Sequence, residues 1–176
     1  ELSNSLEALK DESYILYLAC NFAPKINRNA LASLQLIDLA MKDIVFSKYD
    51  LTLQRIRIQW WLDEISNVSS NKSISNILAL KYLENLNISG ISISQIKNLL
   101  YSYMDYTYIK TNKKFEDIAI KKTKIISKIF KVSDIDMINL LEIAITISSY
   151  PAHSDYDKNI LSLLSDFRGQ KKKHVH

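Results

Sequence analysis

Glycine and proline are nearly absent from this sequence, which has only two of each among its 176 residues. Architectures built from strands need many more of both, because glycine and proline form the tight turns between strands. Hydrophobic residues make up 47% of the chain, which at this length is enough to bury a sizeable core. The composition therefore predicts an all-α fold, in which long helices are joined by short polar loops.

Cysteine is rarer still, since Cys20 is the only one. A single cysteine excludes a disulfide within the chain and is typical of proteins from a reducing compartment. Because Cys20 lies in an apolar segment with no histidine nearby, we expect a buried structural thiol. No apolar run approaches the ~20 residues that span a bilayer, and no signal peptide is visible. These absences predict a cytoplasmic protein, which at most lies peripherally on the inner membrane.

The net charge of +4 is too small to require an anionic partner. Lysines gather at 113–114 and 121–124, where a solvated helix face is the ordinary interpretation and contact with anionic lipid is the functional one. Nucleic-acid binding is not expected, because it needs a denser basic patch on a recognisable fold. Residues 171–176, which read KKKHVH, are expected to be a disordered basic tail without the spacing of a metal site.

Pairs of carboxylates that could hold a metal on a helix are also scarce. Two carboxylates face the same way when they are three or four residues apart, which is the arrangement that Mg²⁺ on a helix requires. Asp38 and Asp43 are five residues apart, which is about 140° around a helix. Glu7 and Asp11 have the right spacing, and a solvated first helix accounts for them. We therefore expect no metal site and no cofactor.

The spacing of apolar residues predicts about eight helices in a single domain that covers residues 1–170. The segment 50–67 partly alternates like a strand, but it is too long for a typical strand and is interpreted as a helix. The predicted helices span residues 4–21, 27–47, 50–67, 74–87, 92–110, 114–131, 134–150 and 155–167. The predicted core residues are Phe22, Leu31, Leu34, Val45, Ile56 and Trp60.

Arginine is scarce beside lysine, and three of the four arginines lie between residues 28 and 57. A chain that otherwise uses lysine is expected to keep arginine where its planar fork of donors is needed. Arg28 and Arg57 are therefore candidates to bind an anion, although a salt bridge that fixes helix packing is the plainer role for each. Trp60 and Trp61 are about 100° apart on a helix, so one is expected in the core and the other beside a cleft or partner surface, unless both only pack. The carboxylates that Arg28 could pair with are Asp38, Asp43 and Glu64.

A motif runs through this arginine-containing segment. It consists of Asp11, then FAP at 22–24, then Arg28, and finally IRIQWW at 56–61. The chain resembles the squalene/phytoene synthase family. Members of that family carry an aspartate, an aromatic-rich turn into FAP, an arginine four residues on and a sequence close to IRLQWW. The likeness is strongest to the proteobacterial and mitochondrial branch that includes a complex I assembly factor. The resemblance implies an abbreviated isoprenoid-synthase helical bundle. We expect Asp11, Phe22, Pro24, Gln59, Trp60 and Trp61 to be structural residues of the motif.

The sequence departs from the family where its enzymes bind metal. Those enzymes carry a DDIVD-type motif on the helix after the arginine, whereas this chain reads KDIVF at 42–46. Only Asp43 remains, because Lys42 and Phe46 stand where the resemblance expects aspartate. Lys42 would repel Mg²⁺ and Phe46 supplies no oxygen. The second family motif, a cluster of asparagine, arginine and aspartate, has no counterpart in the sequence.

Two classes of function remain. The first is a non-catalytic protein that binds a lipid or isoprenoid or acts in assembly, with Arg28, Arg57 and Asp43 as candidate ligand-binding residues. The alternative is a prenyl-diphosphate transferase of the squalene/phytoene synthase type with an atypical active site, which would use Mg²⁺. The family bundle surrounds its cavity with helices from both halves, and the second half is largely missing here. We therefore expect a homo-oligomer or a protein partner to cover the remaining apolar faces.

Overall fold

The computed structural model describes residues 5–69 and 77–131, and every regular element in these two ranges is helical. The predicted all-α fold is thus confirmed. The predicted helices 134–150 and 155–167 and the predicted tail 171–176 lie outside the described residues. The elements are α1 (Ser5–Glu12), α2 (Tyr14–Asn21), the short 3-10 helix η1 (Lys25–Asn27), α3 (Arg28–Val45), α4 (Leu51–Ser69), α5 (Ile77–Ile88), α6 (Ile93–Tyr108) and α7 (Asn112–Phe130).

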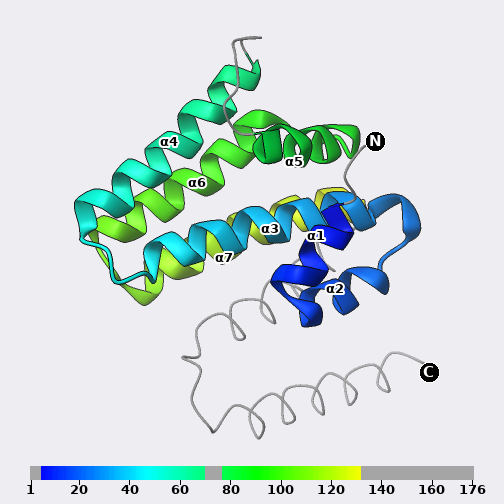
Figure 1. Ribbon diagram of the computed structural model, residues 1–176, viewed down its shortest axis with the longest axis horizontal. Coiled ribbons are helices and arrows are strands. Elements are labelled where there is room, and N and C mark those ends of the chain that lie inside the picture. The colour runs from blue at the N-terminus through cyan, green and yellow to red at the C-terminus, as the bar shows by residue number, and fades with distance from the viewer. Residues whose placement is uncertain (1–4, 70–76, 132–176) are drawn as a thin grey trace, which may run out of the picture.

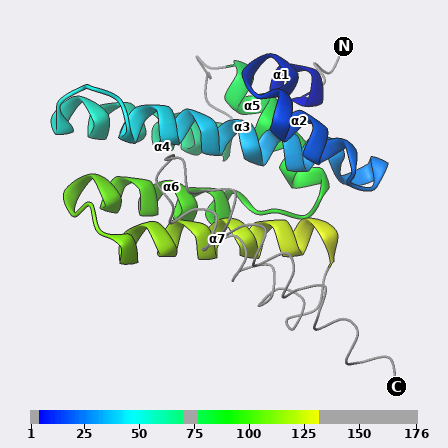
Figure 2. The ribbon, with the colours of Figure 1, turned by 90° about the horizontal axis from the view of Figure 1, so that it is seen from below.

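The four longest helices form two layers. Figure 2 shows α3 and α4 in one layer and α6 and α7 in the other, and Figure 1 shows α4 lying over α6 and α3 over α7. Within the described ranges α3 contacts every other helix, so it is the centre of the bundle. Because each side of α3 meets a neighbour, residues around most of its circumference are buried.

Small polar side chains join α1, α3 and α5 at the end of the bundle where α3 begins. The Ser33 hydroxyl on α3 donates to the Ser5 Oγ on α1 at 2.9 Å. The Asn85 side-chain amide on α5 donates to both, at 2.8 Å to Ser5 Oγ and 3.1 Å to Ser33 Oγ. Serine takes up little space, so three helices approach closely here while their buried polar groups remain hydrogen-bonded.

The structure divides one of the predicted helices into two. The segment predicted as a single helix over 4–21 is divided at Ser13, whose backbone is extended (φ −157°, ψ 99°) and whose Oγ accepts a hydrogen bond from the Leu16 amide at 3.4 Å. Serine is a favoured N-cap because its side chain satisfies an amide that the first helical turn leaves free. After the break, α2 packs against both α1 and α3.

The predicted core is half right. Leu31, Leu34 and Val45 are buried as predicted, but Phe22, Ile56 and Trp60 are exposed, with 91%, 59% and 43% of their surface accessible. On α4 the buried side is instead the stripe of Gln54, Ile58, Leu62 and Ile65. Both stripes have helical spacing because α4 carries apolar residues on two faces, and packing against α6 selects the second. Phe22 lies just beyond the end of α2, where nothing in the described ranges covers it.

Candidate functional site

A pocket of about 460 Å³ lies between α3 and α4. We call it the α3–α4 cleft. Its volume falls within the range of ligand-binding pockets, about 300–1,000 Å³. The cleft is lined by Ala40, Asp43 and Ile44 of α3 and by Ile56, Arg57, Trp60 and Trp61 of α4. The described residues thus give it mostly apolar walls, with one cation and one carboxylate.

The spacing of these residues explains why they meet. Ala40, Asp43 and Ile44 are three and four residues apart and share a face of α3. On α4, Trp60 follows Ile56 by four residues and Trp61 follows Arg57 by four, so the four side chains lie on one side of the helix. The connection between the helices is only five residues long, so α3 and α4 are neighbours that run in opposite directions.

Hydrogen bonds fix the turn between α3 and α4. The Asp50 Oδ1 accepts from the Leu53 amide at 2.9 Å and thereby caps the start of α4. The buried Gln54 side-chain amide donates to the Ser47 carbonyl at 3.3 Å and to the Tyr49 carbonyl at 3.1 Å. These contacts set the position at which α4 begins, and therefore which of its residues face α3.

Arg57 is the cation of the cleft. Its guanidinium carbon lies 4.8 Å from the centroid of the Tyr49 ring, a cation–π contact that orients the group. Although Asp43 lines the same pocket, no ion pair joins it to Arg57, and the described residues give Arg57 no hydrogen bond. As far as the described part of the chain goes, the donors of Arg57 are therefore free to bind an anionic group.

The two tryptophans take different positions. Their rings meet edge to face, with centroids 6.0 Å apart and planes at 81°. Trp61 is half-buried and packs against the core, whereas Trp60 is exposed. One tryptophan in the core and one at a cleft was the prediction, but the assignment of Trp60 to the core is wrong. Both indoles nevertheless line the cleft.

Arg28, the other predicted anion ligand, lies outside the α3–α4 cleft. It opens α3, about 18 Å along the helix axis from Ala40 at 1.5 Å per residue. The Arg28 Nε donates to the Ala23 carbonyl at 2.9 Å, so it ties the start of α3 to the loop that precedes it. The contact that the described residues give Arg28 is thus to a backbone carbonyl rather than to Asp38 or Asp43.

The remaining motif residues lie outside the cleft lining. Asp11 is exposed near the end of α1, and Phe22 and Pro24 are exposed between α2 and η1. Gln59 is exposed on α4, where its Nε2 donates to the Asp63 Oδ1 at 2.8 Å. Gln59 thus makes one contact within its own helix, and the motif residues do not converge on one site.

A buried charge cluster at the bundle centre was not predicted. Asp38 is only 2% exposed, and its Oδ2 pairs with Lys122 Nζ at 2.6 Å and Lys42 Nζ at 2.9 Å. The Tyr103 hydroxyl donates to the Asp38 Oδ1, and Lys122 also donates to the Gln35 Oε1 at 2.8 Å. We call Asp38, Lys42, Tyr103, Lys122 and Gln35 the Asp38 cluster. It joins α3, α6 and α7, so Lys122 does not lie on the solvated face predicted for it.

The cluster controls the ionisation of its members. Burial opposes the charged form of Asp38, but the ammonium groups of Lys122 and Lys42 and the Tyr103 hydroxyl outweigh it and hold the pKa of Asp38 below its usual value. Burial, together with the Asp38 charge, raises the pKa of Tyr103 well above its usual value. Asp38 is therefore a fixed anion, neutralised within the bundle, and is not available to a ligand in the α3–α4 cleft.

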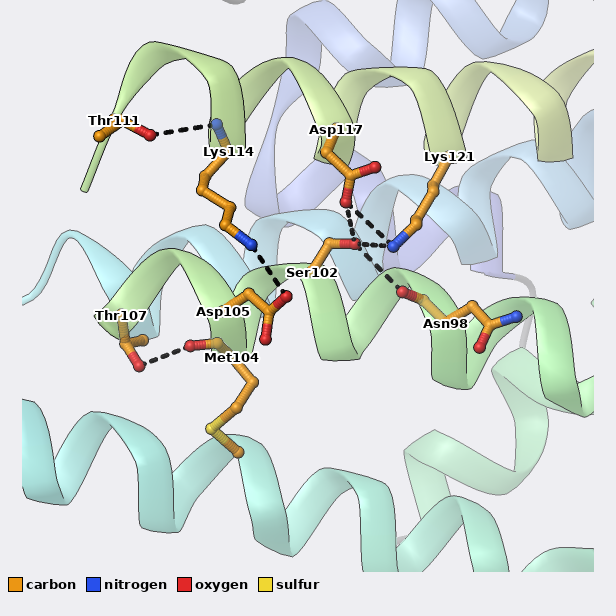
Figure 3. A network of polar contacts seen from close by, with 9 residues as sticks. All are labelled: Asn98, Ser102, Met104, Asp105, Thr107, Thr111, Lys114, Asp117 and Lys121. Atoms are coloured by element: carbon orange, nitrogen blue, oxygen red, sulfur yellow. Dashed lines mark hydrogen bonds and ion pairs between the residues drawn. The ribbon is translucent and has the colours of Figure 1, made fainter. Parts of the chain in front are cut away.

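A second polar network ties α6 to α7 (Figure 3). The buried Ser102 hydroxyl lies 2.8 Å from the Asp117 Oδ2 and accepts a hydrogen bond from the Lys121 ammonium, which itself pairs with Asp117 at 2.9 Å. Lys114 pairs with Asp105 in the same way at 3.2 Å. A serine beside a lysine can form a nucleophile and its base, but only when the lysine is neutral. Here Lys121 is paired with Asp117 on its own helix, and the network joins α6 to α7.

Cys20 is buried, in accord with the predicted structural thiol. Burial raises the pKa of the Cys20 thiol to about 11, against a smaller lowering by the nearby Lys122 ammonium. The thiol therefore stays protonated near neutral pH and is a poor nucleophile.

In the two described ranges, no group of three or more His, Cys, Asp or Glu side chains is placed to hold a metal ion. No helix within these ranges is long and apolar enough to cross a membrane.

Comparison with known proteins gives no relative. No protein-family model, no curated protein and no solved structure matches the chain. The resemblance of residues 11–61 to the squalene/phytoene synthase family therefore stays a prediction from the motif.

Proposed function

We propose that this protein is a non-catalytic, squalene/phytoene synthase-like binding protein, whose α3–α4 cleft holds a lipid or isoprenoid with an anionic head group. The observation that carries the proposal is the convergence of Asp43, Arg57, Trp60 and Trp61 on one pocket. Three of these four belong to the arginine- and tryptophan-rich motif that the sequence singles out.

The chemistry of the cleft fits an amphipathic ligand. Ile44, Ile56 and the two indoles offer an apolar surface to a hydrocarbon chain. Arg57 offers a planar fork of donors, which suits the geometry of a phosphate or carboxylate group. Since Tyr49 contacts one side of the guanidinium, its orientation is set before a ligand arrives and less entropy is lost on binding.

The arrangement of carboxylates supports binding without turnover. Ionising a prenyl diphosphate requires divalent metal to stabilise the charge that develops on the leaving group. Such a metal needs carboxylates that converge on one spot, and Asp43 is the sole carboxylate among the described residues that line the cleft. Asp38, the other aspartate of α3, is neutralised by Lys42 and Lys122. Phe46 packs edge-on against the rings of Tyr106 and Phe115, away from any role as a ligand to metal.

Product analysis separates this proposal from the transferase alternative. The full chain is incubated with farnesyl or geranylgeranyl diphosphate and Mg²⁺, and both condensed products and released diphosphate are measured. We expect neither above the level of a protein-free control. Release of diphosphate that disappears in Asp43→Ala but persists in Asp63→Ala, an exposed aspartate of α4 outside the cleft, would overturn the non-catalytic assignment.

Fluorescence tests binding itself, because both tryptophans of the chain line the cleft. Titration with farnesyl diphosphate in the presence of EDTA should change the tryptophan emission in a saturable way. Farnesol and inorganic diphosphate, which each supply half of the ligand, should bind more weakly than the whole molecule. Equal responses to farnesol and farnesyl diphosphate would mean that Arg57 does not recognise the head group.

A further inference from the structure

The α3–α4 cleft contains a carboxylate for which a purely anionic ligand has no use. Asp43 lines the cleft together with Arg57, but the described residues give its carboxylate neither a hydrogen bond nor an ion pair. A ligand that carries only negative charge would bring its phosphate to Arg57 and place like charge beside Asp43, which is unfavourable. A ligand that carries a cation as well as an anion would satisfy both residues.

The lysines near Asp43 in sequence and space do not neutralise it. Lys42 directly precedes Asp43, but its Nζ pairs with the Asp38 Oδ2 at 2.9 Å. Lys48 is exposed in the turn and lies outside the cleft lining. The Lys110 ammonium donates instead to the Val45 carbonyl at 3.4 Å. Within the described part of the chain, Asp43 is therefore available to a cation that the ligand brings.

The directions of α3 and α4 separate the two charges along the cleft. Figure 1 shows the two helices diverging from the turn that joins them. In a helix each Cα–Cβ bond tilts toward the N-terminus, so Asp43 on α3 tilts away from the turn and Arg57 on α4 tilts toward it. The contact of Arg57 with the ring of Tyr49, a residue of the turn, agrees with this direction. The cleft thus has a cationic end near the turn and an anionic part farther from it.

The two indoles complete a site for an organic cation. Trp60 and Trp61 lie one helical turn beyond Ile56 and Arg57, on the side toward which Asp43 tilts. The face of an aromatic ring attracts an ammonium group, and indole does so most strongly. Trp60 is exposed, and because the two rings meet edge to face, one ring keeps both faces clear of the other. A carboxylate and an accessible indole in one pocket favour an ammonium group.

We propose that the ligand of the cleft is a single-chain phospholipid with a zwitterionic, phosphoethanolamine-type head group. Arg57 binds the phosphate, and Asp43 and Trp60 bind the ammonium group. The buried Ile44 provides an apolar floor for the start of the chain. The cleft volume of about 460 Å³ lies in the lower part of the range for ligand pockets, which favours one chain over two. This inference rests on the proposed function, because it assumes that the cleft binds an amphipathic ligand through Arg57.

Calorimetric titration of the full chain with two lipids tests the head group. Lauroyl lysophosphatidylethanolamine and lauroyl lysophosphatidylglycerol share their chain and phosphate, and only the first carries an ammonium group. Below its micelle concentration, the first should bind about tenfold more tightly, which corresponds to about 1.4 kcal/mol. Asp43→Asn should remove this preference and Trp60→Leu should reduce it. Asp63→Asn is the matched control and should preserve the preference, because Asp63 is an exposed aspartate of α4 outside the cleft lining.

The outcomes separate this inference from the function on which it rests. Equal affinity for the two lipids, or a preference that survives Asp43→Asn, would overturn the zwitterionic ligand. If Arg57→Ala still weakens both lipids in that case, the proposed function stands and only the head group is wrong. Binding of both lipids that Arg57→Ala leaves unchanged would contradict the proposed function itself. Glycerophosphoethanolamine, which lacks the chain, should bind more weakly, and equal affinity for it would overturn the assignment to a lipid.

Discussion

Removal of the buried charge at the centre of the bundle should strongly destabilise the protein. Asp38→Asn keeps the size of the side chain but deletes the anion that neutralises Lys122. Lys42 is about a third exposed and can turn to water, whereas Lys122 is mostly enclosed between α3 and α7. Breaking a buried ion pair by removing one partner costs about 3–5 kcal/mol, because the other charge stays buried and uncompensated.

Urea unfolding followed by circular dichroism measures this cost. The expected loss of about 3–5 kcal/mol for Asp38→Asn should lower the midpoint without changing the slope, since the folded surface is unchanged. Asp117→Asn is the control, because the Asp117–Lys121 pair is partly exposed and such pairs contribute about 1 kcal/mol or less. A similar, small loss for both variants would refute the idea that Asp38 holds α7 to α3.

Three further predictions concern the same bundle. Because the pKa of Asp38 is lowered in the fold, its contribution is complete above the unfolded value of about 4 and is lost as the pH falls through the folded value. The stability difference between the unmodified protein and Asp38→Asn should therefore be constant from pH 5 to 8 and shrink below about pH 4, as acid titrations of both would reveal. Trp61→Ala should cost about 2 kcal/mol or more, and Trp60→Ala less than half of that, because only Trp61 packs on the core; calorimetric unfolding that ranks them in the opposite order would contradict the packing. Iodoacetamide should label Cys20 at pH 8 only after denaturation, since burial keeps the thiol protonated, and mass spectrometry would detect labelling of the folded protein if this is wrong.

Local sequence signals predicted the helices well where caps mark their ends. Ser92 forms a capping box with Gln95 at the start of α6, and Thr111 caps α7, close to the predicted starts of both helices. The same kind of signal at Ser13 was missed, because the apolar positions on either side of it, Leu9 and Tyr14 among them, were assigned to one helix. On α4 two apolar stripes competed, and the sequence alone could not say which one α6 would cover.

The sequence predicted the candidate site only in part. Asp43 and Arg57 could be predicted to approach each other, because they lie on successive helices joined by a short turn. Arg28 could also have been separated from them by sequence, because it begins the helix predicted over 27–47 and the helical rise places it about 18 Å from Ala40. The Asp38 cluster was beyond prediction, because Tyr103 and Lys122 are 65 and 84 residues from Asp38. The sequence indicated only the pair of Asp38 and Lys42, which are four residues apart on one helix.

Calorimetric titration of the full chain with farnesyl diphosphate in EDTA tests most directly whether the α3–α4 cleft binds an anionic amphipathic ligand without metal. Arg57→Ala should weaken binding about 10- to 100-fold, which corresponds to the loss of a charged hydrogen bond of about 1.5–3 kcal/mol. Lys48→Ala removes the same charge from the adjacent turn, where Lys48 is exposed and outside the cleft lining, and should leave the affinity within about twofold. Equal affinity of Arg57→Ala and the unmodified protein, or binding that appears only when Mg²⁺ replaces EDTA, would contradict the account.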